Sequence, residues 1–166
     1  MLDNIVNALS GVNGYLTVFI ISMHPVVELR GAIPVGVGLD LNWLLLYVAS
    51  VCGNMILVPF IILFIRPIVE FLMRTKKLRP LGEKIKNKVM SKSAKVTKYK
   101  MMGLFVFVAI PLPGTGAWTG AMLAGLMDMR LKDAVPMILL GVMVAGVLMM
   151  GISYGFGELF SHFFAI

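Results

Sequence analysis

An acid and a base stand two residues apart in an otherwise apolar stretch near the N-terminus. The stretch reads HPVVELRGAIP, residues 24–34, and its charged side chains are Glu28 and Arg30. Ionisable groups in apolar segments of a membrane protein are costly, and they usually line a cavity or a substrate path. A guanidinium grips phosphates with paired hydrogen bonds, and a buried carboxylate can gain or lose a proton. We therefore expect Arg30 to bind an anion and Glu28 to couple this binding to protons or Na⁺.

The same two side chains could instead form a salt bridge whose only role is to hold this segment in place. Residues two apart lie on nearly opposite sides of a helix but on the same side of an extended segment, so an extended tip would let them pair. A buried ion pair is weak evidence for stability, because apolar packing often replaces it without loss. We therefore favour the functional interpretation. His24 is expected to be a polar neighbour with a secondary role.

A second broken stretch reads IPLPGTGAWTG, residues 110–120. Its two prolines and three glycines expose backbone N–H groups beside a helix start, and such groups form anion-binding nests. Trp118 could contact a substrate or simply fill space between the two tips. Together the two stretches supply the expected substrate-binding residues, which are Arg30, Gly31, Pro113, Gly114, Thr115, Gly116, Trp118 and Thr119.

Membrane helices are expected to position these groups. The chain has 166 residues, of which 59% are apolar and 14% charged, with a mean hydropathy of +0.93, whereas soluble domains carry roughly 25% charged residues. Uncharged runs of 25 and 24 residues follow Asp40 and Asp133, and about 20 residues cross a bilayer. Asn54, inside the first run, should point inward, either towards the site or to join helices. Cys52 is the single cysteine, so neither a disulfide nor a metal site is expected.

The two stretches that carry the chemistry are not expected to cross as straight helices. Proline and glycine interrupt each one near its middle. Non-helical backbone at membrane depth survives only against protein or water. Arms of about 9 to 12 residues, rising about 1.5 Å per residue, reach roughly halfway across the hydrocarbon and back. The sequence therefore predicts two re-entrant hairpins whose tips meet near the midplane.

Positive charge is concentrated in one loop. Twelve of the fifteen lysines and arginines lie between Arg66 and Lys100, which is typical of a cytoplasmic loop rather than a nucleic-acid surface. With two hairpins, Arg130 and Lys132 share the side of this loop, and both termini lie outside. Apolar residues recur at helical spacing from Leu78 to Lys100, so this segment is either a helix on an anionic leaflet or a solvated loop that fixes orientation.

The two halves also resemble each other. Asp40 to Gly53 and Asp128 to Gly141 are both 13 residues, and the dipeptide GA at 31–32 recurs at 116–117. A hairpin returns to its starting side, so a hairpin followed by one span crosses the membrane once. The second copy would therefore enter from the opposite side and be inverted, as in many transporters. The fold class expected is an all-α integral membrane domain, with repeat one at 16–73, a basic linker at 74–100, repeat two at 101–157 and a short tail at 158–166.

These motifs carry a family resemblance over essentially the whole chain. The pairing of ELRGAIP with PLPGTGAWTGA after a basic loop resembles the small multidrug export family, which is distantly similar to the DedA (VTT-domain) superfamily. That superfamily has two opposed re-entrant hairpins, and its members include polyprenyl-phosphate translocases and lipid scramblases. The resemblance implies a transporter or flippase in which Glu28 is the acid of the first hairpin and 113–125 is the second hairpin. The superfamily usually places an arginine in the second hairpin, whereas Arg30 lies in the first.

We therefore expect a transporter or flippase for an anionic amphiphile, such as a polyprenyl phosphate, in a prokaryotic plasma membrane. The expected partners are a membrane lipid or amphipathic small molecule, a proton or Na⁺, and a second copy of the chain in a homodimer. No cofactor and no nucleic acid are expected. The alternatives are an exporter of amphipathic cations and a non-transporting membrane organiser. An enzyme is not expected, because the chain has no HExxH motif and too few acids and histidines to build a catalytic dyad beyond Glu28 and His24.

Overall fold

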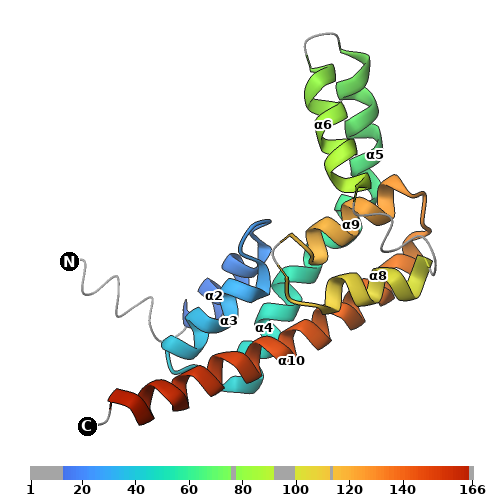
Figure 1. The fold of residues 1–166 in the computed structure, drawn as a ribbon. Coiled ribbons are helices and arrows are strands. Elements are labelled where there is room, and N and C mark those ends of the chain that lie inside the picture. Colours follow the sequence, from blue (N-terminus) through green and yellow to red (C-terminus); the bar gives the residue numbers. More distant parts are fainter. Residues whose placement is uncertain (1–12, 76–77, 92–99, 113, 165–166) are drawn as a thin grey trace. The chain divides into compact units, whose positions relative to one another are not determined.

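The computed structural model describes residues 13–75, 78–91, 100–112 and 114–164. Every regular element within these ranges is a helix (Figure 1), so the expected all-α fold class is confirmed. The chain divides into two compact units, each described by itself. The first holds the chain up to Ile56 and from Met143 onward, and the second holds Leu57–Val142.

Three short helices and part of a long one form the first unit. They are α2 (Asn13–Met23), α3 (Glu28–Gly38), α4 (Trp43–Ile56) and the portion of α10 (Leu131–Phe164) that begins at Met143. α2 packs against both α3 and α4. Asn42 caps α4, because its side-chain Oδ1 accepts the Leu44 N–H at 3.1 Å, which satisfies one unpaired donor of the first turn. The Tyr47 hydroxyl donates to the Met143 carbonyl at 2.9 Å and so joins α4 to α10.

Helices α5 (Val58–Arg74), α6 (Arg79–Met90), α8 (Lys100–Ala109) and α9 (Ala117–Leu126) form the second unit with the first part of α10. α9 packs on α5, and α8 packs on α9. Gly125 allows the first of these contacts, because a Cβ there would lie only 2.6 Å from the Ile62 carbonyl oxygen.

Two helical stretches are long and apolar enough to cross a membrane, namely Trp43–Arg74 (32 residues) and Leu131–Gly155 (25 residues). They cover most of the two runs expected to span, which are residues 41–65 and 134–157. The first run is divided, however, because α4 ends at Ile56 and α5 begins at Val58. Pro59 explains the junction, since proline has no N–H to bond four residues back and its ring collides with that carbonyl.

Proline acts differently within α3. Pro34 was expected to help break the first hairpin, but it lies inside α3. The non-helical bend comprises residues 24–27 alone. Proline is tolerated within helices of membrane proteins when neighbouring groups satisfy the freed carbonyl. Pro136 likewise lies inside α10.

The basic linker contains the expected helix, but the described part is shorter than predicted. α6 ends at Met90, and Lys92 and Lys95 lie outside the described residues. α6 packs on α5, with Val89 buried and Leu81 half exposed. Part of the apolar stripe is therefore covered by protein.

Helices α3 and α9 end in the same way. Asp40 and Asp128, each just beyond a helix, adopt left-handed φ values of 53° and 57°. The next residue donates its N–H to a carbonyl five residues back in both cases, from Leu41 to Gly36 at 3.2 Å and from Met129 to Ala124 at 3.0 Å. This is the Schellman arrangement, which usually takes glycine at the left-handed position.

Candidate functional site

The first bend places a buried acid at the start of a helix. Glu28 opens α3 and is only 6% exposed. Its backbone has a left-handed φ of 51°, and its N–H donates to the His24 carbonyl at 2.9 Å. An L-residue rarely adopts this conformation. The strained backbone turns the chain from α2 into α3.

Arg30 is helical and half buried, which corrects one expectation. The extended tip that would place Glu28 and Arg30 on the same side does not occur, because both residues belong to the first turn of α3. Residues two apart on a helix point about 200° apart. Both residues nevertheless lie in the same helical turn and make polar or electrostatic interactions. The two charges therefore belong to one local site.

The remaining candidates of the first unit play different roles. His24 is exposed at the bend, where its Nδ1 accepts the Val26 N–H at 3.4 Å. Gly31 has no room for a side chain, because a Cβ there would lie 2.2 Å from a Val27 methyl group. Asn54 is 1% exposed, and it points inward as expected. Its Oδ1 has no hydrogen-bond partner among the described residues.

The second bend separates α8 from α9 and depends on glycine. Gly114 and Gly116 have φ values of 77° and 151°, a region that other residues rarely occupy. Thr115 was expected to offer its hydroxyl to a substrate, but its Oγ1 lies 2.8 Å from the Ile110 carbonyl and 2.9 Å from the Leu112 carbonyl. The hydroxyl therefore closes the turn. Pro113 lies outside the described residues.

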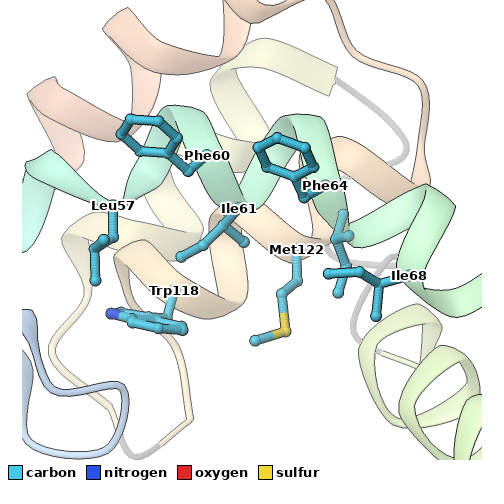
Figure 2. A pocket seen from close by; sticks show the side chains of 8 residues that line it. Leu57, Phe60, Ile61, Phe64, Ile68, Trp118 and Met122 are labelled. Carbon is cyan, nitrogen blue, oxygen red and sulfur yellow. The ribbon is translucent and has the colours of Figure 1, made fainter.

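An apolar pocket of about 260 Å³ lies between α5 and α9. Figure 2 shows Trp118 and Met122 on one side and Phe60 and Phe64 on α5. All lining side chains are apolar except for the indole N–H, and these are Leu57, Phe60, Ile61, Phe64, Ile65, Ile68, Trp118 and Met122. Trp118 therefore lines a surface that suits an apolar chain. Thr119, the next residue, is half buried in α9.

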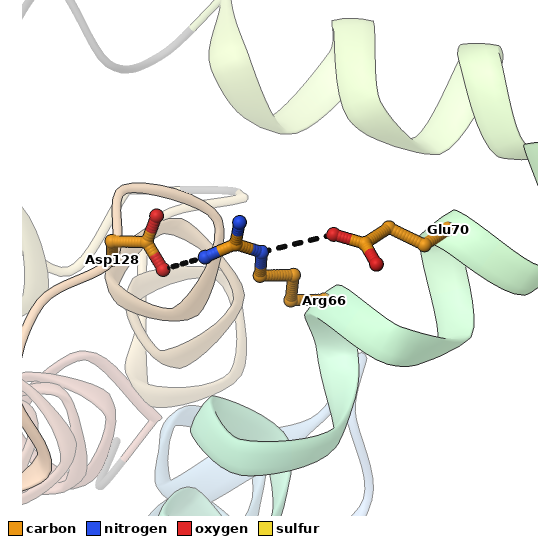
Figure 3. A network of polar contacts seen from close by, with 3 residues as sticks. All are labelled: Arg66, Glu70 and Asp128. Atoms are coloured by element: carbon orange, nitrogen blue, oxygen red, sulfur yellow. Dashed lines mark hydrogen bonds and ion pairs between the residues drawn. The ribbon is translucent and has the colours of Figure 1, made fainter.

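An ion-pair network in the second unit was missed by the sequence reasoning. Arg66 on α5 lies between two acids (Figure 3), pairing with Asp128 and, at 3.0 Å, with Glu70. The Arg66–Glu70 pair has the four-residue spacing of helical ion pairs and could have been found. The Asp128 contact joins positions 62 residues apart, so no local pattern indicates it. The network anchors the end of α9 to α5.

The two bends fall in different units, so the expectation that their tips meet stays a prediction. Glu28, Arg30, His24 and Asn54 belong to the first unit, and residues 114–119 belong to the second. Within the described residues, no group of three or more His, Cys, Asp or Glu side chains could hold a metal ion.

Comparison with known proteins identifies the family. Residues 28–148 match the family described as "Putative small multi-drug export protein". Among curated proteins and solved structures, no significant match to this chain is found. The matched region begins at Glu28, directly after the first bend, and includes Arg30, the second bend and the first apolar stretch. With the two apolar stretches, the family indicates a membrane protein that acts as a transporter. Because the match covers more than half of the chain, the protein is a member of this small multi-drug export family.

Proposed function

We propose that the protein is a transporter or flippase that moves an anionic amphiphile, such as a polyprenyl phosphate, across a prokaryotic plasma membrane. Arg30 binds the headgroup, and Glu28 couples the movement to protons or Na⁺. The observation that carries the proposal is the bend between α2 and α3, where Glu28 is buried at a helix start beside a half-buried arginine. Intramembrane charges of this kind are generally functional.

The lengths of the helices support re-entrant hairpins. α2 and α3 have 11 residues each, and α8 and α9 have 10 each. A helix of this length rises about 15 to 17 Å, which is about half of the roughly 30 Å hydrocarbon thickness. Each hairpin then enters and leaves on one side. The basic linker and Arg130 lie in the cytoplasm, and both termini lie outside.

Matching backbone features support an inverted repeat. The offset from Asp40 to Asp128 is 88 residues, and the same offset relates the ends of α3 and α9 and the starts of α4 and α10. It also places Glu28 opposite Gly116, and both have positive φ at the start of the second arm. The two GA dipeptides, at 31–32 and 116–117, are three residues out of this register. The repeat therefore rests on the helix boundaries and turns.

The first bend has the electrostatics that an anionic headgroup requires. The start of α3 carries the partial positive charge of a helix N-terminus, which attracts anions. Arg30, in the first turn of this helix, adds a full charge and the planar fork that fits a phosphate. Helix starts facing anionic substrate groups at broken hairpins are a common device of transporters. Within the second unit, described by itself, the apolar pocket beside Trp118 would suit a hydrocarbon chain.

Export of amphipathic cations is the second candidate. The wholly apolar character of the Trp118 pocket favours an amphiphile of either charge, and Glu28 could serve as the counter-charge of a cation. Arg30 argues against it, because an arginine two residues from Glu28 offsets the negative charge that a cation needs. Two spans and two short hairpins offer little surface to bury, so we propose that the transporter works as a homodimer. We also propose that it has no enzymatic activity, because the chain has too few acids and histidines for a catalytic dyad beyond Glu28 and His24.

Native mass spectrometry of the purified protein tests the substrate class. We expect co-purified anionic lipid, and added polyprenyl phosphate should compete for the same site. Arg30→Lys should weaken this binding, because an ammonium lacks the guanidinium fork, while Arg79→Lys on α6 serves as the control. Retention of cationic amphiphiles alone would favour drug export. If Arg30→Lys left lipid binding unchanged, Arg30 would not be part of the lipid-binding site.

A further inference from the structure

Two side-chain oxygens on α4 are buried and have no hydrogen-bond partner in the part of the chain that the structure describes. Ser50 is 0% exposed and Asn54 is 1% exposed. Neither Ser50 Oγ nor Asn54 Oδ1 has a hydrogen-bond partner among the described residues. The large majority of buried side-chain polar atoms are paired, so each exception needs an explanation such as an unseen water or ion.

These two oxygens lie on one face of α4, because residues four apart are neighbours on a helix surface. An amide Oδ1 is an acceptor only, and a hydroxyl has two acceptor lone pairs. Asn54 Oδ1 therefore lacks a hydrogen-bond donor or a cation, and Ser50 Oγ, which also carries a donor O–H, can accept from the same group.

Helix packing places Glu28 at the level of Asn54. Gly36 of α3 lies against Leu46 of α4, since a Cβ at Gly36 would be 2.1 Å from a Leu46 methyl group. The two helices run in opposite directions because the short segment 39–42 joins them. Eight residues back along α3 lies Glu28, and eight residues forward along α4 lies Asn54. Eight residues rise about 12 Å along a helix, so Glu28 and Asn54 lie about equally far from the contact between Gly36 and Leu46.

A second contact agrees with this level. Gly53, next to Asn54, faces α2 near its end, where a Cβ would lie 3.0 Å from the Ser22 Cβ. The bend and Glu28 follow Ser22 closely in the chain. The C-terminal end of α2 also carries a partial negative charge that favours a cation. Asn54, Glu28 and the end of α2 therefore lie at one level of the first unit, and Ser50 lies one turn away on the face of α4 that carries Asn54.

We propose that Asn54, Ser50 and Glu28 form a Na⁺ site at the junction of α2, α3 and α4. All three supply oxygen ligands, which hard cations prefer, and helix C-terminal ends coordinate Na⁺ in other transporters. The proposal rests on the proposed function and names its coupling ion. When an anionic headgroup occupies Arg30, the field of the arginine on Glu28 is offset, and the carboxylate holds Na⁺ more strongly. Na⁺ and the anionic substrate therefore bind with positive cooperativity.

Equilibrium binding of radioactive sodium to the purified full chain tests the site, with choline chloride keeping the ionic strength constant. Wild type should bind Na⁺ saturably. Asn54→Leu should weaken Na⁺ binding about tenfold or more, the scale of lost metal-site partners, and Ser50→Ala should also weaken it. Asn54→Asp keeps the oxygen and adds charge, so it should bind at least as tightly as wild type. Ser153→Ala on α10, which also removes an unpartnered hydroxyl, should behave as wild type.

Saturable Na⁺ binding that Asn54→Leu leaves unchanged, or no saturable binding by wild type, would overturn the Na⁺ site. Thermal melting of each variant checks folding, and Ser50→Ala keeps the test decisive if Asn54→Leu does not fold. Transport of an anionic amphiphile on a pH gradient, without Na⁺ binding, would refute the site and leave the proposed function standing. Na⁺ binding without any transport of the amphiphile would support the Na⁺ site and refute the proposed function.

Discussion

Replacing Gly53 with alanine should destabilise the first unit, because α2 and α4 touch at this position. A Cβ on Gly53 would lie 2.3 Å from the Phe19 carbonyl oxygen and 3.0 Å from the Ser22 Cβ. Favourable contact needs roughly 3.5 Å, so the first distance is about 1 Å too short. The obstacle is backbone, which cannot rotate away, and the helices must move apart.

The expected cost follows from this geometry. Overpacking a close contact costs about 1 to 3 kcal/mol, and a backbone obstacle places Gly53→Ala in the upper half of this range. At about 2 to 4 °C per kcal/mol, the melting temperature should fall by about 4 to 12 °C. Thermal unfolding of the detergent-purified protein, followed by intrinsic fluorescence, measures the shift.

Two further variants make the comparison specific. Gly151→Ala on α10 meets nothing within 4 Å, so it should leave the melting temperature unchanged or raise it slightly. Gly36→Ala meets only the Leu46 side chain, so adding Leu46→Ala should relieve its clash. A melting temperature of Gly53→Ala equal to that of wild type would show that α2 and α4 do not pack in this register.

Three further predictions concern the turns and the topology. Asp40→Gly should preserve stability, whereas Asp40→Val should cost about 1 to 2 kcal/mol because of the left-handed backbone, measurable by thermal unfolding. Thr115→Val should lower stability by about 1 kcal/mol through loss of the turn hydroxyl, while Thr115→Ser should not; equal effects of the two would contradict a role for the hydroxyl. On a cysteine-free background, single cysteines at Asn42 and Arg130 should label from opposite sides of the membrane, the latter from the cytoplasm, and labelling from the same side would exclude the inverted repeat.

Much of the fold could be predicted from the sequence, because the membrane limits the choices. Long uncharged runs indicate spans, and the described residues 24–27, 110–112 and 114–116 interrupt helices as proline and glycine suggest. The junction at Leu57 was not predicted, since Pro59 and Pro136 both stand within long apolar runs and only the first accompanies a break between helices. The outcome at each proline depends on the neighbours that satisfy the freed carbonyl.

The candidate site was predicted in its residue types more than in its geometry. Glu28 and Arg30 stand out because charge is rare in apolar sequence. Their helical arrangement was not predicted, since it depends on Glu28 itself taking the left-handed conformation that starts α3. Ser50 was missed, because a buried serine has no distinct sequence signature until its lack of a partner is known. The Arg66–Asp128 pair joins distant segments and required the structure.

Transport in reconstituted liposomes tests the central claim most directly, using an anionic polyprenyl phosphate and, separately, an amphipathic cation. The variants are wild type, Glu28→Gln, Arg30→Lys and the double substitution Glu28→Gln with Arg30→Gln. We predict that wild type moves the anion, that Glu28→Gln binds it but loses its response to the ion gradient, and that Arg30→Lys binds it more weakly. The double variant should fold, since no charge remains unpaired, but should transport nothing. Transport by the double variant at the wild-type rate would reduce Glu28 and Arg30 to a structural bridge and contradict the account.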